Sequence, residues 1–231
     1  MKAHGEIIHH PTGRVSVYHV RRLGAEDIED LLHMQMIVEA QVQEKDTLQP
    51  LSKQEFNTIL EGAGLLIGVF VEEELIAFRA LWYPGPDPEN LGMDIGLPEE
   101  EWDLVVHQEI SCVRPDYRGN RLQKRMGAWI MQAFREEDTD KAHLLCTVHP
   151  RNISSLKDKL AQGMAIVRLK EKYAGMLRYI LYRPVSGVWE WEDEREKVVQ
   201  RADLTAQKEL LAAGYYGAEL MDDCLIFRRS K

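Results

Sequence analysis

Residues 112–123 combine the end of an expected strand, a short turn and the start of a basic helix. From Leu122 onward, apolar residues recur at helical spacing, so residues 118–123 lie at the first turn of this helix. The first N–H groups of a helix have no partner inside it and together carry about half a positive charge. Gly119 lets the backbone approach an anion closely, and Asn120 tolerates a left-handed conformation. The segment therefore predicts an α/β protein with a phosphate-binding loop.

The local charge of this segment opposes the charge of the whole chain. Between Arg114 and Arg125 there are five bases and one acid, Asp116, whereas the chain has a formal net charge of -9. The bases are Arg114, Arg118, Arg121, Lys124 and Arg125. A pI of about 5.4 argues against general nucleic-acid binding, which relies on a broad basic face. We therefore expect the segment to hold phosphate groups, and we expect no nucleic-acid partner.

The stretch V-x-P-x-Y-R-G-N-x-L-Q resembles the acyl-CoA pyrophosphate loop of the GCN5-related N-acetyltransferase (GNAT) superfamily. The family pattern is Gln or Arg, two residues, Gly, one residue, and then Gly or Ala. Arg118 fits the first position, Arg121 stands where the first Gly is expected, and Gln123 replaces the last small residue. A second family block follows at the expected distance, with LLCTVHP at residues 144–150 and N-x-x-S-x7-G at residues 152–163. Two spaced blocks are more specific than one loop.

The resemblance implies a mixed, mostly antiparallel central sheet flanked by helices, over residues 14–183. The expected strands cover residues 15–23, 65–71, 75–82, 104–113, 144–148, 166–173 and 177–183, and the expected helices cover residues 24–42, 53–60, 122–135 and 152–162. Residues before this domain are expected to fray. Residues 184–231 are expected to form a C-terminal extension, with a helix at 206–213 and a strand at 224–229. That strand is expected to dock on the domain or on a second subunit, as in a homodimer.

The resemblance also implies acetyl-CoA as the cosubstrate and indicates which residues bind it. They are Cys112, Val113, Arg118, Gly119, Asn120, Arg121, Leu122, Gln123, Asn152 and Ser155. The strand backbone near Cys112 and Val113 is expected to pair with the pantetheine amides, so the site needs no unusual side chain there. Asn152 is the family's polar contact near the pantetheine or the thiol, and its alternative role is to cap the helix that follows.

Acetyl transfer to an amine requires a proton acceptor, because only the neutral amine attacks the thioester. Strand alternation puts His107, Glu109 and Ser111 on one face of the strand expected at residues 104–113. Family members often carry the proton acceptor, His or Glu, at the positions of His107 and Glu109. The resemblance thus implies an N-acetyltransferase in which a primary amine attacks acetyl-CoA directly, with these two residues as candidate general bases. Glu109 has the alternative roles of substrate binding and an internal salt bridge.

One further family position supports a competing interpretation. About seven residues after the Asn, the family often has a Tyr that protonates the leaving thiolate, and here the residue is Lys159. Because its helix is rich in lysine, Lys159 is expected to face solvent, although its charge would also stabilise a thiolate. Together with Arg121 and Gln123, this departure favours the alternative of a catalytically degenerate acyl-CoA-binding or regulatory module.

Residues 84–103 form a long, acidic connection that leads into the strand at residues 104–113. The connection contains seven acids and no base: Asp87, Glu89, Asp94, Glu99, Glu100, Glu101 and Asp103. Long loops in compact domains are commonly functional, and a negative rim raises the local concentration of cations. The segment therefore predicts a cationic amine as acceptor. The alternative is a solvated acidic flap.

The cysteine pattern bears on compartment and on metal binding. Cys112, Cys146 and Cys224 are odd in number and form no CxxC pair, which argues against a disulfide framework and a zinc cluster. We therefore expect no metal and a reducing, cytoplasmic environment. No apolar run approaches the roughly 20 residues of a membrane-spanning helix, and the first residues lack a secretory apolar stretch, so we expect no membrane association.

Overall fold

The computed structural model describes residues 3–41, 48–137, 139–173, 175–192 and 196–231. Contacts divide the chain into two compact units, which are Met1–Tyr83 with Gln108–Asp140 and Pro84–His107 with Lys141–Lys231. The division falls inside strand β5 (Val105–Val113), so the strand that carries both candidate bases contributes to both units. Among the described residues, no helix is long and apolar enough to cross a membrane.

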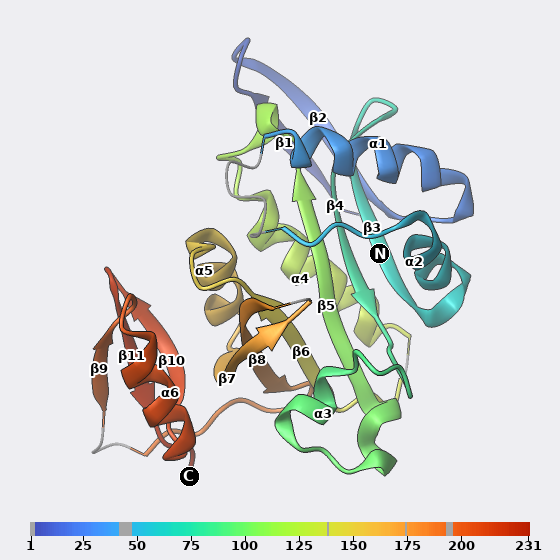
Figure 1. Ribbon diagram of the computed structural model, residues 1–231. Coiled ribbons are helices and arrows are strands. Elements are labelled where there is room, and N and C mark those ends of the chain that lie inside the picture. The colour runs from blue at the N-terminus through green and yellow to red at the C-terminus, as the bar shows by residue number, and fades with distance from the viewer. Residues whose placement is uncertain (1–2, 42–47, 138, 174, 193–195) are drawn as a thin grey trace. The chain divides into compact units, whose positions relative to one another are not determined.

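The first unit is a sheet with helices on both faces (Figure 1). Its strands lie in the order β1-β2-β3-β4-β5, and the pairs from β1 to β4 are antiparallel. Besides its part of β5, the strands are β1 (Ala3–His9), β2 (Arg14–Arg22), β3 (Gly64–Val71) and β4 (Glu74–Trp82). The helices are α1 (Ile28–Glu39), α2 (Lys53–Thr58) and α4 (Leu122–Arg135), with short turns η1 (Ala25–Asp27), η3 (Ile59–Ala63) and η5 (Pro115–Tyr117).

The two faces of this sheet hold different helices in place. On one face, Phe56 of α2 packs edge-on against Phe78 of β4, with ring centroids 5.8 Å apart, inside the main apolar core. Arg79, the next residue along β4, points to the opposite face. There its guanidinium donates to the backbone carbonyl of Gln123 in α4, at 3.1 Å. The start of α4 is therefore attached directly to the sheet.

The second unit continues from the first residues of β5. Its strands lie in the order β5-β6-β8-β7-β10-β11-β9. They are β6 (His143–Val148), β7 (Ala165–Lys172), β8 (Met176–Pro184), β9 (Lys197–Gln200), β10 (Tyr216–Met221) and β11 (Cys224–Arg228). The helices are α3 (Leu91–Ile95), α5 (Ile153–Ala161) and α6 (Leu204–Ala212), with the turn η4 (Glu99–Leu104). The β5–β6 pair is parallel and the other pairs are antiparallel, which confirms the expected mixed, mostly antiparallel sheet.

Most expected elements are confirmed, with small shifts at their ends, and α4 has the expected bounds. The start of α2 shows why such helices can be predicted. The Ser52 hydroxyl accepts the Glu55 N–H at 3.2 Å, and the Glu55 carboxylate accepts the Ser52 N–H at 2.7 Å. This reciprocal capping satisfies two N–H groups that the helix itself leaves unpaired.

One expectation about a segment is wrong. The N-terminal residues do not fray, because Ala3–His9 forms β1 and pairs antiparallel with β2. Only Ile7 is buried in this strand, so its apolar pattern is too weak to reveal backbone pairing. The acidic connection 84–103 contains α3 and η4, and the Asn90 side chain caps α3 by accepting the Gly92 N–H at 2.8 Å.

The C-terminal extension has the expected helix and strand, as α6 and β11. It also contains β9 and β10, and β10 pairs with β7 at Gly217 and Ile166. The extension thus joins the sheet of its own unit. The expected boundary between residues 183 and 184 stays a prediction.

Candidate functional site

The loop between β5 and α4 has the backbone expected of an anion-binding turn. Gly119 has a φ of 82° and Arg121 a φ of 58°, both in the left-handed region. Left-handed geometry costs a residue with a Cβ roughly 1–2 kcal/mol, and glycine avoids most of this cost. Arg121 therefore adopts the conformation that suits the family's Gly at this position, while adding a charge.

The N-terminus of α4 has no side-chain cap. Arg121 is its N-cap residue and makes no capping hydrogen bond. By contrast, α2, α5 and α6 are capped by the side chains of Ser52, Asn152 and Asp203. The N–H groups of the first turn of α4, which have no partner within the helix, are thus suited to an anionic ligand, because its oxygens would accept from them.

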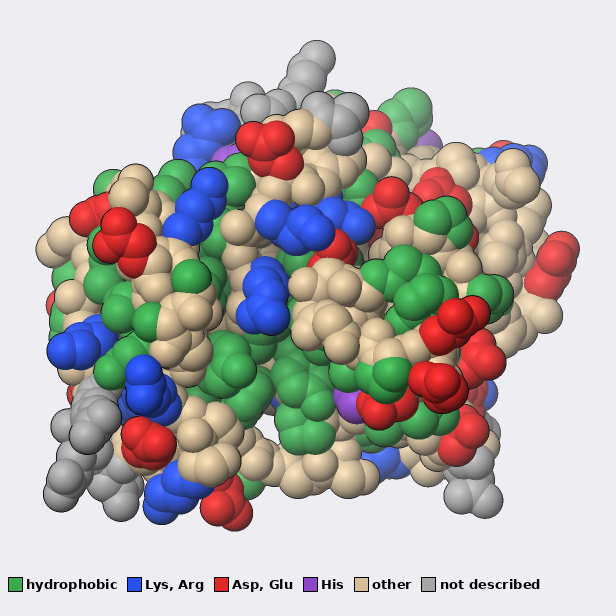
Figure 2. Space-filling model, turned by 60° about the horizontal axis from the view of Figure 1, so that its bottom comes forward, with side chains coloured by type: hydrophobic (Ala, Val, Ile, Leu, Met, Phe, Trp, Pro, Cys, Tyr) green, Lys and Arg blue, Asp and Glu red, His purple; other side chains and the backbone are tan. Residues whose placement is uncertain are grey.

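Three of the five bases in this segment are exposed: Arg118, Arg121 and Lys124. The other two are engaged within the protein. Arg114 bonds to Glu74 and Asp116, and Arg125 bonds to the Tyr18 hydroxyl. The Arg114 guanidinium holds the pKa of Asp116 below its ordinary value, so this acid stays charged and paired. Figure 2 shows both basic and acidic side chains on the face that it draws, in a chain whose net charge is -9.

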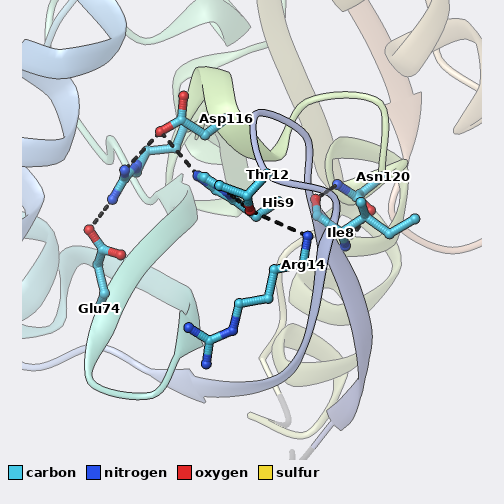
Figure 3. Close-up of polar contacts among 8 residues, drawn as sticks. Ile8, His9, Thr12, Arg14, Glu74, Asp116 and Asn120 are labelled. Carbon is cyan, nitrogen blue, oxygen red and sulfur yellow. Dashed lines mark hydrogen bonds and ion pairs between the residues drawn. The ribbon is translucent and has the colours of Figure 1, made fainter.

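The remaining predicted loop residues differ in what they can offer a ligand. Leu122 is buried, so only its backbone can face an anion, whereas Gln123 is half-buried. The Asn120 amide bonds to the backbone N–H and C=O of Ile8 in β1, at 3.1 and 2.8 Å (Figure 3). The side chain of Asn120 is thus engaged in hydrogen bonds within the protein, and its backbone is the part that can contact a ligand.

Arg79 is a residue of this region that the sequence argument missed. Its side chain is 1% exposed, and besides the Gln123 carbonyl it donates to the Gln108 side chain in β5. It ties together β4, β5 and the first turn of α4. A single arginine inside the apolar strand LIAFRALW was the available signal, since a charge in such a strand requires a partner.

The alternation expected along β5 does not hold throughout. Ile110 and Cys112 lie in the core with Phe78, whereas Gln108 bonds to Arg79 on the opposite face. The side-chain pattern therefore shifts between Gln108 and Ile110. Glu109 is half-buried at this shift, so its direction does not follow from counting alternate residues.

The cysteine of β5, Cys112, is poorly suited to act as a nucleophile. Cys112 is 1% exposed, and burial raises the pKa of its thiol to about 12. Cys146 is equally buried, as expected for core residues. In the part of the chain that the structure describes, no group of three or more His, Cys, Asp or Glu side chains is arranged to hold a metal ion.

His107 lies in the second unit and is 3% exposed. Its Nε2 accepts the backbone N–H of Leu91, the first residue of α3, at 3.1 Å. A ring nitrogen that accepts this bond has its lone pair engaged. His107 therefore has a structural role in holding α3, whatever else it does.

Asn152 and Ser155 also lie in the second unit, at the start of α5. The Asn152 side chain accepts the Ser155 N–H at 3.0 Å, so its capping role is confirmed. Lys159, two turns further along, was expected to face solvent, and this expectation is wrong. It is 6% exposed, and its ammonium lies 3.8 Å from the Asp158 carboxylate. The number of lysines in the helix did not predict the burial of Lys159, because burial depends on which face of the helix packs against other residues.

The acidic connection is partly neutralised by bases from other segments. Lys172 of β7 contacts Glu89 and Asp94, both at 3.1 Å. His143 of β6 contacts Glu101 at 2.8 Å. These contacts hold α3 and η4 against their own unit, and the Lys172 ammonium offsets part of the negative charge that the sequence alone suggested.

No protein-family model matches the chain, and no curated protein matches its sequence. Solved structures match its fold. The ribosomal-protein-S18-alanine N-acetyltransferase from Escherichia coli aligns with a TM-score of 0.54 and 14% identity, over 77% of this chain and 98% of its own. An N-acetyltransferase from Staphylococcus aureus Mu50 aligns with a TM-score of 0.55 and 14% identity, over 74% and 99%.

A third match has a bound cosubstrate. A GNAT superfamily phosphinothricin acetyltransferase from Sinorhizobium meliloti, in complex with acetyl-CoA, aligns with a TM-score of 0.52 and 15% identity, over 71% of this chain and 86% of its own. At such identities the likeness concerns the fold, and activity has to be argued from the residues of this chain.

Proposed function

We propose that this chain, which has the fold of the GNAT superfamily, transfers an acetyl group from acetyl-CoA to a primary amine. The observation that carries the proposal is the uncapped N-terminus of α4, preceded by left-handed Gly119 and Arg121. A diphosphate would accept from the N–H groups of this turn and would pair with exposed Arg118 and Arg121. The backbone near Cys112 and Val113 would pair with the pantetheine amides.

Glu109 is the better of the two candidate bases. It belongs to the same unit as the loop and is half-buried, whereas the Nε2 of His107 already accepts the Leu91 N–H. In the proposed reaction, the neutral amine nitrogen bonds to the thioester carbon, and the carboxylate of Glu109 takes a proton from that nitrogen as the bond forms, directly or through water. Collapse of the resulting oxyanion breaks the C–S bond and releases the CoA thiolate.

Lys159 is a candidate for stabilising that thiolate. It occupies the position at which the family often has a Tyr, and its ammonium is buried 3.8 Å from the Asp158 carboxylate. A thiolate leaves without full protonation, because its ordinary pKa is about 8.5. Asn152 would contact the pantetheine or thiol in addition to capping α5.

A second candidate function is acyl-CoA binding without transfer, as in a regulatory module. The specific observation in its favour is that His107 is committed to the backbone of α3. This candidate and the acetyltransferase share the loop and differ only in the chemistry at β5.

Calorimetry with CoA and acetyl-CoA tests the shared part, and we expect both to bind. Incubation of the protein and acetyl-CoA with mixed amines, followed through thiol release and mass spectrometry, tests the chemistry. Amine-dependent thiol release with an acetylated product supports the transferase. Binding without release would favour the regulatory module, and absence of CoA binding would remove both.

We further propose that the acceptor is a cationic amine. Glu99 and Glu100 of η4 are exposed, so they remain as a source of negative potential after the ion pairs of the acidic connection are taken into account. The proposal is tested by the salt dependence of the acceptor KM.

A further inference from the structure

The N-terminal hairpin, formed by β1 and β2, contacts the loop at residues 114–121 through several hydrogen bonds and ring contacts. Ile8 pairs with Val15 of β2, and its own N–H and C=O both bond to the Asn120 side chain (Figure 3). In an antiparallel pair, the N–H and C=O of alternate residues point away from the partner strand, and β1 is the edge strand of the sheet. The Asn120 amide thus completes this edge in the way that a neighbouring strand would.

Four more contacts join the same two segments. The His10 N–H donates to the Asp116 carbonyl at 2.9 Å. The ring of His9 packs on Tyr117 with centroids 5.2 Å apart, and its Nε2 lies 3.7 Å from the Asp116 carboxylate. The His10 ring covers Gly119, because a Cβ built on Gly119 would lie 2.8 Å from its Nε2. The hairpin therefore contacts the loop from residue 116 to residue 120.

The loop has a reason to need such support. Asn120 stands between Gly119 and Arg121, both of which have left-handed backbone. A residue with a Cβ keeps that conformation only where its surroundings hold it. The bonds to Ile8 fix Asn120 on the side of the loop that faces the hairpin, and this leaves the first turn of α4 to face a ligand.

We propose that the N-terminal hairpin is a positioning element of the anion-binding loop, and that it acts through the bonds between Asn120 and Ile8. The identity of the anion as CoA diphosphate rests on the proposed function, whereas the ordering of the loop does not. Asn120 acts here as a positioning residue, since its side chain is directed to β1.

The test compares three variants. Ile8→Pro removes the N–H that Asn120 accepts, and Asn120→Ala removes the side chain. Glu6→Pro is the matched control. Glu6 pairs with Val17 two residues earlier on the same strand, so its N–H also points outward, and within the described residues it makes no hydrogen bond to the loop. An outward N–H on an edge strand tolerates proline.

Hydrogen exchange on the free protein reads loop order without any ligand. We expect the amides of residues 117–123 to exchange at least about tenfold faster in Ile8→Pro and Asn120→Ala than in the wild type and in Glu6→Pro, because each variant breaks the same tie. Equal exchange in all four proteins would overturn the proposal. Asn120→Ala also removes the bond from the Asn120 amide to the Tyr117 carbonyl inside the loop, at 3.0 Å, so a change on the β1 side decides the question. If Ile8→Pro does not fold, replacing Ile8 with its α-hydroxy acid analogue removes the same N–H without the proline ring.

Calorimetry with CoA then reads the consequence for binding. We expect about tenfold weaker binding in Ile8→Pro and in Asn120→Ala, unchanged binding in Glu6→Pro, and no further loss when the first two are combined, since coupled residues are not additive. Additive losses of CoA affinity would show that the two variants do not act through the same hydrogen bonds between Asn120 and Ile8. A wild type that does not bind CoA would remove the proposed function, and hydrogen exchange would still decide whether the hairpin orders the loop.

Discussion

Arg118 is the residue whose replacement tests anion binding most directly, because it is exposed in the loop and fits the first position of the family pattern. Hydrogen bonds to charged groups are worth roughly 1.5–3 kcal/mol, so Arg118→Ala should weaken CoA binding about tenfold to a hundredfold. Arg135→Ala is the control, because Arg135 is an exposed arginine in the last turn of the same helix. Calorimetry of the two variants measures the difference. Equal affinities would place the phosphates elsewhere.

Glu109 and His107 can be separated by the kind of loss that each variant causes. Removal of a general base lowers turnover about 10²- to 10⁴-fold, so Glu109→Gln should lower kcat by this factor with little change in CoA affinity. His107→Gln should mainly lower the melting temperature, because the bond to Leu91 holds α3.

Steady-state kinetics and thermal unfolding of both variants decide between these assignments. A folded His107→Gln protein with strongly reduced kcat, beside a fully active Glu109→Gln protein, would move the base to His107. Two fully active variants would move the chemistry away from β5.

At the scale of elements, α5 allows capping and ligand contact to be tested apart. Asn152→Ala removes the acceptor of the Ser155 N–H and should destabilise the protein by about 1 kcal/mol, within the range of 0.5–2 for lost caps. Asn152→Asp keeps an acceptor and removes the amide donor, so its stability should stay near that of the wild type. If Asn152 also donates to acetyl-CoA, both variants should raise the KM for acetyl-CoA. A raised KM in the Ala variant alone would mean that capping accounts for the whole effect.

Elements with local signals could be predicted, and those without them could not. The start of α2 has Ser52 and Glu55, and α4 has a regular apolar stripe, so both follow from neighbouring residues. Strand β1 was missed because it buries only Ile7 and is held by backbone pairing to β2. The change in side-chain direction along β5 between Gln108 and Ile110 was missed, because counting along the sequence assumes that side chains alternate regularly.

At the scale of the whole molecule, the basic loop could be predicted because its charge and turn residues are contiguous. The long-range contacts that support the loop could not be predicted. Asn120 bonds to Ile8, which is 112 positions away, and Arg79 reaches Gln123 across 44 positions. Such contacts arise from the order of strands in the sheet, which composition and spacing do not encode. The burial of Lys159 has the same origin, since packing of the helix face decides it.

Long-range charge should determine which amines the protein attracts. Of the acids in residues 84–103, Asp94 and Glu101 are paired with bases of their own unit, whereas Glu99 and Glu100 are exposed. Exposed charges act over a screening length of about 10 Å at 0.1 M salt. If the acceptor is cationic, replacing both exposed glutamates with Gln should raise its KM about two- to fivefold at low salt, and high salt should remove the difference.

The control is the double replacement of Glu61 and Glu73 with Gln, because these exposed acids lie in the other unit and give the same change in net charge. Glu101 stays unchanged in both proteins, so that its contact with His143 is preserved. The measurement is the acceptor KM of each variant across a salt series, at saturating acetyl-CoA. Equal KM values for the two double variants with a flat salt response, or a preference for anionic amino acids, would exclude a cationic acceptor. Neither result would affect the proposed binding of acetyl-CoA, because the loop and α4 are unchanged in both variants.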